Sequence, residues 1–559
     1  MSTSWTRLVI ILTATLILLA GPMTTIVSSA VLPAEWSVQW EKVSPELHTM
    51  LASDPWSDAD IIIEMKVSLH PQKGTAAKPE QRAKNKLEQH GGKRVQPLGI
   101  VAGASGRISL DRLARLSRDS EVRYISLDSR LVPNGTPFTG DMIDFARAVN
   151  ASALWEQGIS GAGVTVAVLD SGVQSLPSGI DPKRIVAAVD LVTGRDPSTD
   201  KGGHGTNVAG IIAGFDPSTS WSGIAPKSQI ASVKVINDQG SALKSQVIRG
   251  IQWSVQNRRA YGIRIINLSL GAPAATSYKQ DPLATAVEIA WHAGIVVVTA
   301  AGNAGPGPGT IVSPGYDPFV ITAGAIDMNA TLPRADDMVA QFSSRGPTID
   351  SLTKPDVVAP GRKIVSSRVP NSFLEQMFPD RKAGTFIRLS GTSQAAAAVS
   401  GVVALMLSAN PRLTPDQVKH QLKASASTLN GSDRNAAGAG YVNAAEATKS
   451  LPGYVNQSAR PADGFREIVL ATMKGGGPLK WKDLKHNNGV DSRGTLWSNV
   501  AWDNVAWDNI SWDNVSWDNV AWDNISWDNV AWDNVTWDNV TWDNVAWDNV
   551  SWDVAGKFD

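Results

Sequence analysis

The feature that most constrains the fold is an alternation of apolar strands and helices that runs from Ala148 to Leu451. Near-continuous apolar strands separated by helices are typical of a parallel sheet that is covered by helices on both faces. The sequence therefore predicts an α/β fold with a mostly parallel sheet. Strands are expected at 164–169, 230–236, 263–270, 295–300 and 319–325, and helices at 205–213, 243–257, 283–292 and 393–408.

A smaller unit of mixed pattern precedes this region, with its core between residues 60 and 130. Its apolar and charged segments predict the order strand, helix, strand, helix, strand, which indicates a compact α+β domain. The helices are expected at 80–89 and 108–116. The segment Pro133-Asn-Gly-Thr-Pro137 then breaks the pattern, as an exposed connection does.

The first thirty residues have the pattern of a secretory signal peptide. Arg7 precedes an apolar run from Leu8 to Ala20, and the small residues Ser28, Ser29 and Ala30 follow. An uncleaved anchor helix is the alternative, because weakly polar residues extend the run to Val27. No later stretch approaches the ~20 apolar residues that a membrane span needs. We therefore expect the remainder to be soluble and exported.

Composition excludes several classes of function. The chain has no cysteine, so it has no disulfide, no thiolate metal site and no cysteine nucleophile. Lys plus Arg is 51 and Asp plus Glu is 52, which argues against nucleic acid as a partner. The charge is uneven, however: residues 499–559 carry a net −11, and the rest of the chain carries +10.

The acidic C-terminal region repeats Ala/Ser/Thr-Trp-Asp-Asn-Val/Ile every five residues from Ala501. A polar, glycine-rich stretch at 452–498 is interpreted as the linker before it. The repeats at 499–559 fit a disordered tail with tryptophan contact points, or a solenoid that stacks tryptophan on tryptophan. A low-complexity expansion without a specific role is the third interpretation.

Chemistry-bearing residues follow or open predicted elements of the large region. Open α/β sheets place their sites beyond the carboxyl ends of the strands. Asp170 ends a buried strand, His204 lies between glycines, and Ser393 opens a long helix. A serine hydroxyl becomes a nucleophile when a histidine takes its proton and a carboxylate orients that histidine. Asn303, after another buried strand, can donate to an oxyanion beside a backbone N–H of the Ser393 helix.

Each of these residues also has a structural interpretation. Asp170 and Asn303 could be turn residues, and His204 and Ser393 could cap helices. Together they are more specific, because the chain order Asp, His, Ser is one of the few that known nucleophilic triads use.

The motifs around these residues resemble those of the subtilisin-like serine proteases, the subtilases. They are Asp170-Ser-Gly-Val, His204-Gly-Thr-x-Val-Ala-Gly210 and Gly391-Thr-Ser393-x-Ala-Ala. The segments 342–347, 354–361 and 438–444 also look like subtilase segments. The resemblance implies a catalytic domain at 142–451. It also implies that residues 31–135 are an inhibitory propeptide and folding chaperone.

The resemblance also implies how a peptide would bind. Leu268-Ser269-Leu270-Gly271 is similar to one edge of the subtilase cleft, and Asp238-Gln-Gly240-Ser241 is similar to the facing edge. Main-chain pairing between these edges favours broad endopeptidase activity. Ala301 and Gly302 would line the first specificity pocket. Val312 would lie near its rim, so medium apolar side chains are expected at the cleavage position.

The sequence departs from the subtilase motifs at two positions, and it does not settle whether calcium is bound. Asn207 replaces a second histidine, and Gln394 puts a polar group after the nucleophile where an apolar one usually packs. Neither is a triad position. No cofactor is required for the chemistry. The sequence has no Asp-x-Asp-x-Asp-Gly loop, which leaves structural calcium open and unassigned.

These observations predict a secreted, broad-specificity serine endopeptidase that is made as a self-processed zymogen. Ser393 would attack the peptide carbonyl, His204 would carry the proton, Asp170 would orient His204, and Asn303 would stabilise the oxyanion. The partners would be protein or peptide substrates, its own propeptide, and a cell surface or polymer through the tail. The alternative is a catalytically silent scaffold or surface-binding protein that works through the tryptophan-rich tail.

Overall fold

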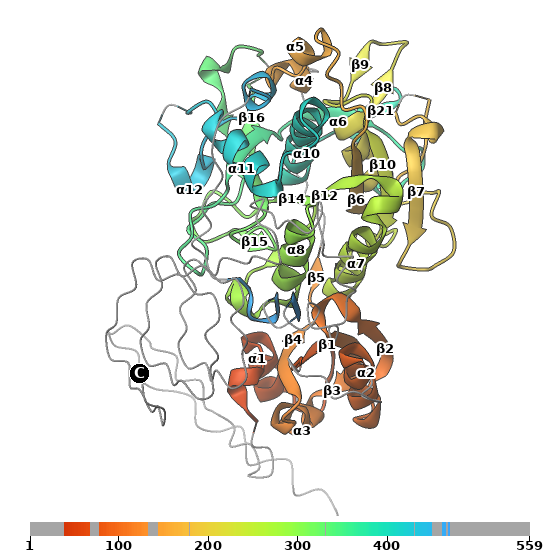
Figure 1. The fold of residues 1–559 in the computed structure, drawn as a ribbon, viewed down its shortest axis with the longest axis vertical. Helices are drawn as coiled ribbons and strands as arrows, with labels where there is room; N and C mark the ends of the chain where they lie inside the picture. The colour runs from red at the N-terminus through yellow and green to blue at the C-terminus, as the bar shows by residue number, and fades with distance from the viewer. Residues whose placement is uncertain are drawn as a thin grey trace, which may run out of the picture.

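A computed structural model of the chain describes residues 38–67, 78–131, 144–177, 179–329, 331–429, 431–449, 461–465 and 468–469 (Figure 1). The predicted signal peptide, the stretch at 132–143, most of the predicted linker and the repeats at 499–559 lie outside the described residues.

The larger domain is built on an eight-stranded sheet with the order β17-β16-β14-β12-β6-β10-β7, in which β18 also pairs with β16. All neighbours are parallel except β17, which runs antiparallel to β16. The predicted α/β fold with a mostly parallel sheet is confirmed. The strands are β6 (Thr165–Asp170), β7 (Ile185–Asp190), β10 (Gln229–Lys234), β12 (Ile263–Leu268), β14 (Val296–Ala300), β16 (Ile321–Asp327), β17 (Met338–Val339) and β18 (Val357–Pro360).

Two pairs of helices cover the sheet. One pair is α6 (His204–Ala213) and α10 (Thr392–Ala409), which pack on each other, and the other is α7 (Lys244–Tyr261) and α8 (Pro282–His292). Among the described residues, α10 alone is long and apolar enough to cross a membrane, but 89% of that window is buried inside the protein. It is therefore the central core helix of this domain.

Shorter elements complete the large domain. The helices are α4 (Phe145–Ala148), α5 (Ser152–Trp155), α9 (Phe373–Met377), α11 (Pro415–Ala424), α12 (Arg434–Ala437) and α13 (Ala444–Ala447). The strands are β8 (Phe215–Asp216), β9 (Trp221–Ser222), β11 (Ala242–Leu243), β13 (Ala272–Pro273), β15 (Val312–Ser313), β19 (Ile364–Ser367), β20 (Lys382–Ala383) and β21 (Phe386–Leu389).

The N-terminal unit has an antiparallel sheet with the order β2-β3-β1-β4. The prediction of three strands was wrong in one respect, because β3 was missed: its Gly, Ala and Ser residues have weak strand propensity. The packed core also begins earlier than residue 60, since Val43, Leu47 and Leu51 belong to it. The elements are α1 (Pro45–Ser53), β1 (Asp58–Met65), α2 (Pro79–Gln89), β2 (Lys93–Leu98), β3 (Gly103–Ser109), α3 (Leu113–Arg118) and β4 (Val122–Leu127).

The N-terminal unit lies below α7 and α8 in the view of Figure 1. The 3₁₀ turn Gly99–Val101 packs on both helices, and the N–H of Ile100 donates to Oε1 of Gln252 at 2.8 Å. Asp128 accepts hydrogen bonds from the N–H and the hydroxyl of Ser245 at the start of α7. The chain that leaves the unit, β5 (Arg130–Leu131), then pairs antiparallel with β11.

A short segment beyond the predicted catalytic domain also packs on the core. Ala462, Phe465, Ile468 and Val469 are all buried in the main hydrophobic cluster. The interpretation of 452–498 as linker therefore does not hold for these residues.

Candidate active site

Asp170 and His204 form the first part of the site. Asp170 is the last residue of β6 and is fully buried, and His204 is the first residue of α6 and is 5% exposed. Nδ1 of His204 lies 2.8 and 2.9 Å from the two carboxylate oxygens of Asp170. Gly205 permits this approach, because a Cβ there would lie 2.1 Å from the carbonyl oxygen of Gly172.

The environment of His204 raises its pKa above the ordinary value. Burial acts against the charged imidazolium and is the largest single influence, but it is outweighed by the charge and hydrogen bond of Asp170 and by the charge of Asp200. A histidine with a raised pKa is a stronger base, and the carboxylate fixes which ring nitrogen carries the proton.

Asp200 holds the start of the histidine helix in place. It is fully buried and accepts hydrogen bonds from the N–H groups of Gly203 and Thr206, both at 2.8 Å, and from the hydroxyls of Thr206 and Ser171, both at 2.7 Å. Burial nevertheless raises the pKa of Asp200. Asp200 was not predicted as a site residue from the sequence. Its available signal was a carboxylate four residues before the histidine, at the start of a helix.

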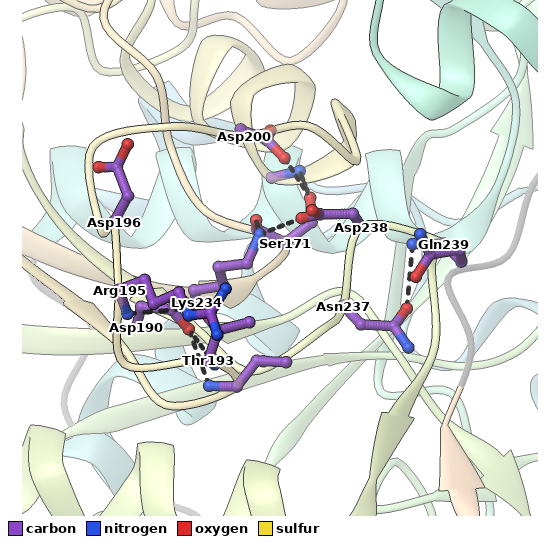
Figure 2. A network of polar contacts seen from close by, with 12 residues as sticks. Ser171, Asp190, Thr193, Arg195, Asp196, Asp200, Lys234, Asn237, Asp238 and Gln239 are labelled. Atoms are coloured by element: carbon purple, nitrogen blue, oxygen red, sulfur yellow. Dashed lines mark hydrogen bonds and ion pairs between the residues drawn. The ribbon is translucent and has the colours of Figure 1, made fainter.

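Figure 2 shows Asp200 within a wider polar network that reaches the predicted edge of the cleft. The Nζ atom of Lys234, a buried residue at the end of β10, donates to the carbonyl oxygen of Ser171 at 2.9 Å and to Oδ1 of Asp238 at 2.6 Å. The residue after the triad aspartate is thereby tied to the segment at 238–241. Lys234 was also missed, because a lysine that ends an apolar strand carries no distinctive pattern.

Ser393 lies in the first turn of α10 and is fully buried. Its hydroxyl donates to the carbonyl oxygen of Ser269 at 2.9 Å, and the hydroxyl of Ser269 donates back to the carbonyl oxygen of Ser393 at 2.9 Å. Nε2 of His204 is buried and has no hydrogen-bond partner among the described residues. The acceptor that a nucleophilic serine needs is therefore present and unused in this state.

Asn303 is held with its amide nitrogen available. Its Oδ1 accepts from both the N–H and the hydroxyl of Thr392, each at 2.9 Å. The carbonyl side of the amide is thus fixed against the residue before the serine. Its Nδ2 is buried without a partner among the described residues. Thr392 was not predicted from the sequence, because its contact with Asn303 forms only when two distant segments of the chain meet.

The predicted substrate residues lie at three places. Ser269 and Leu270 are fully buried, with Ser269 bonded to Ser393 as described. Gly271 and Gly302 flank the side chain of Val312, since a Cβ on Gly271 would lie 2.3 Å from one of its methyl groups and a Cβ on Gly302 would lie 2.7 Å from the other. Gly240 lies apart from them, in the hollow beside His204. Val312 therefore fills the space between two glycine walls, and its N–H donates to the carbonyl of Ala301 at 3.0 Å.

A hollow with a volume of about 150 Å³ lies beside His204. Part of its lining consists of polar side chains and backbone atoms, including those of Gln394 and Gly240. The rest is apolar and comes mainly from α9 and the residues that follow it. The helix is attached directly to the histidine loop, because the N–H groups of Phe373 and Leu374 donate to the carbonyls of Lys201 and Gly202 at 2.8 and 3.1 Å. The apolar lining residues are Phe373, Leu374, Met377, Phe378 and Leu389.

The two departures from the family pattern contact each other. Nε2 of Gln394 donates to Oδ1 of Asn207 at 3.3 Å, and both side chains are buried. The polar group after the nucleophile therefore has a polar partner on α6. This bond satisfies Nε2 of Gln394 and Oδ1 of Asn207, whereas Oε1 of Gln394 is buried without a partner among the described residues.

The described residues include no group of three or more His, Asp or Glu side chains placed to hold a metal ion. The four side chains of the predicted site supply a carboxylate, an imidazole, a hydroxyl and an amide.

This fold and this set of side chains define a serine-type endopeptidase. A family model confirms the class: residues 161–442, half of the chain, match the model of the subtilase family, and the chain belongs to that family.

Individual relatives agree with this assignment. The chain is 43% identical over 305 residues to serine protease AprX of Bacillus subtilis, in a match that covers 53% of this chain and 68% of the relative. It is 34% identical to subtilisin DY of Bacillus licheniformis, covering 54% of this chain and 94% of the relative. It is 31% identical to subtilisin E of Bacillus subtilis, covering 64% and 84% respectively.

Proposed function

We propose that this chain cleaves peptide bonds with Ser393 as nucleophile, His204 as general base and then general acid, and Asp170 as the group that orients the imidazole. The observation that carries the proposal is that Nε2 of His204 and Nδ2 of Asn303 are both buried and have no hydrogen-bond partner in the part of the chain that the structure describes. Buried polar atoms are normally satisfied. Nε2 of His204 is the atom that would accept the proton of the serine hydroxyl, and Nδ2 of Asn303 is the atom that would donate a hydrogen bond to the oxyanion.

The hydroxyl of Ser393 must first leave the carbonyl of Ser269. Rotation of its side chain would pass the hydrogen bond to Nε2 of His204, which then takes the proton as the oxygen attacks the peptide carbonyl. The negative charge that develops on the carbonyl oxygen would be stabilised by Nδ2 of Asn303 and by the N–H of Ser393. That N–H belongs to the first turn of α10, where helix N–H groups lack intrahelical partners.

The substrate would lie as an added strand between residues 268–271 and 238–241, so main-chain hydrogen bonds would supply most of the recognition. The side chain of Val312 makes the first specificity pocket shallow. Small or medium apolar residues are therefore expected before the cleaved bond. The apolar wall from α9 favours a second apolar side chain beside His204. Cleavage of a peptide library that varies these positions would measure both preferences.

We further propose that residues 31–135 are the inhibitory propeptide and folding chaperone, and that self-cleavage occurs between about Leu131 and Asp141. The antiparallel pairing of β5 with β11 supports this, because it directs the chain leaving the N-terminal unit toward the segment at 238–241. Residues 1–30 would direct secretion, and the domain at 142–451 would be the mature enzyme. The repeats at 499–559 would contact a cell surface or a polymeric substrate.

Labelling with a fluorophosphonate tests the catalytic proposal directly. The full chain should react, and Ser393→Ala should not. Ser408→Ala is the matched control, because Ser408 lies near the far end of the same helix and should leave labelling unchanged. A chain that binds peptides but never reacts would support the silent scaffold instead.

A further inference from the structure

The segment that follows the catalytic domain lies at the seam between the two units. Residues 461–465 and 468–469 appear in Figure 1 as short blue pieces between α8 and the N-terminal unit. The apolar side chains of this segment are all buried: Ala462, Phe465, Ile468 and Val469. Burial of this kind is unusual for a connection between domains, which normally runs over the surface.

A polar contact fixes the start of the segment to α8. The N–H of Ala462 donates to both carboxylate oxygens of Glu288, at 3.0 and 2.9 Å. Glu288 is fully buried. Glu288 also shares a side-chain hydrogen bond with Asp317. Removing the segment would still take a backbone donor away from this buried carboxyl group, which is costly.

An apolar contact follows one turn later. The ring of Phe465 lies 4.6 Å from the ring of His292, at the end of α8, and the phenylalanine is 7% exposed. Burial of the phenylalanine ring stabilises this contact. The segment is therefore bound to α8 at two points, one polar and one apolar.

Gly464, between these two points, touches both units. A Cβ at this position would lie 2.7 Å from Nη2 of Arg123 and 3.1 Å from Oε2 of Glu64, both in the N-terminal unit. It would also lie 3.0 Å from Oγ1 of Thr285 on α8. Arg123 and Glu64 form a buried ion pair between β4 and β1. The absence of a side chain at Gly464 thus allows three elements to meet.

We propose that residues 461–465 and 468–469 form a clasp whose binding surface is formed jointly by α8 and the Arg123–Glu64 pair of the N-terminal unit. The clasp would hold that unit on the catalytic domain. It would remain on α8 after the unit departs, since its two anchors are both there. The segment beyond the catalytic domain would then help to set how fast the inhibitory unit is released, which rests on the zymogen function proposed above.

The test compares two truncated chains, both carrying Ser393→Ala so that no self-cleavage occurs. One ends after Lys449 and lacks the clasp, and the other ends after Gly475 and keeps it; both lack the repeats. Hydrogen exchange at the amides of Lys244 and Ser245 reports docking, because these amides donate to Ser129 and Asp128 of the N-terminal unit. Exchange should be faster by about tenfold or more in the shorter chain, since loss of one buried apolar side chain suffices for that change.

Point variants in the full Ser393→Ala chain keep the test decisive if the shorter chain fails to fold. Phe465→Ala and Gly464→Val should both accelerate exchange at Lys244 and Ser245. Ile349→Ala, at an apolar residue whose side chain is exposed to solvent, should not. Equal exchange in all chains would overturn the clasp. Because the readout does not require catalysis, it is independent of whether the wild-type chain processes itself.

Discussion

Asn303 owes its orientation to Thr392. Replacing Asn303 with Ala should lower kcat by about 10²–10³ with little change in KM, the loss known from a subtilisin for removal of one oxyanion donor. Thr392→Val should also lower kcat, because it removes the hydroxyl that holds Oδ1 of Asn303. Thr392→Ser keeps the hydroxyl and is the control. Steady-state kinetics measure all three variants, and an unchanged kcat in Asn303→Ala would remove this residue from the mechanism.

The raised pKa of His204 has a consequence for the pH profile. The imidazole must be neutral to take the serine proton, so kcat/KM should rise with pH as His204 loses its proton. Because Asp170 and Asp200 raise this pKa, the acid limb should lie above the value of an ordinary histidine, which is about 6.5. In Asp200→Asn the limb should move to lower pH. A limb that stays in place would show that Asp200 acts only through the fold.

The contact between Gln394 and Asn207 can be measured as a coupling. We expect Gln394→Met to destabilise the chain, since it leaves the buried Oδ1 of Asn207 without this donor. Asn207→Ala should cost less in the Gln394→Met background than alone. A double-mutant cycle on the free energy of unfolding should give a coupling of about 0.5–3 kcal/mol. Strict additivity would mean that the two departures from the family pattern are unrelated.

At the scale of elements, the docking of the N-terminal unit depends on the start of α7. Asp128 accepts from the N–H and hydroxyl of Ser245, much as a capping side chain does. Asp128→Ala should weaken inhibition of the processed domain by the N-terminal unit by about 1 kcal/mol, or about fivefold in the inhibition constant. Glu88→Ala, on the exposed face of α2, is the control and should change it little. Equal inhibition constants for Asp128→Ala and the unchanged unit would mean that other contacts supply the docking energy.

The elements of the large domain were predictable because their patterns are strong. The buried strands β6, β10, β12 and β14 are nearly continuous runs of apolar residues, and α10 is a long run of small apolar ones. β7 and β18 were not predicted, since β7 is partly exposed and β18 is only four residues long. In the N-terminal unit β3 was not predicted, because its side chains do not favour a strand. It is a strand because its backbone pairs with β1 on one side and β2 on the other.

The site was predictable to a different extent. The triad residues and Asn303 follow from short motifs at the ends of strands and helices. Asp200, Lys234 and Thr392 could not be found in this way, because each acts on a residue that is distant in space or in the chain. The apolar wall from α9 has no sequence signal, since nothing local indicates that this helix attaches to the histidine loop.

At the scale of the whole molecule, charge separates the tail from the body. The repeats carry −11 and the rest carries +10, so attraction between the tail and basic surfaces should weaken with salt. Removing residues 499–559 should leave hydrolysis of small peptides near normal and should reduce the fraction retained on cells or insoluble protein. Paired measurements of kcat/KM and retained fraction decide the question. If neither changes, the repeats have no specific role.

The pairing of β5 with β11 also has a consequence for how one copy of the chain interacts with another. A two-residue ladder is made by backbone groups, which are the same in every peptide. This backbone edge therefore does little to discriminate between β5 of the same molecule and β5 of another copy. On the zymogen function proposed above, an N-terminal unit released by one copy should be able to occupy the cleft of another. Onset of activity in a population should then depend on total protein concentration, and dilution should shorten the lag.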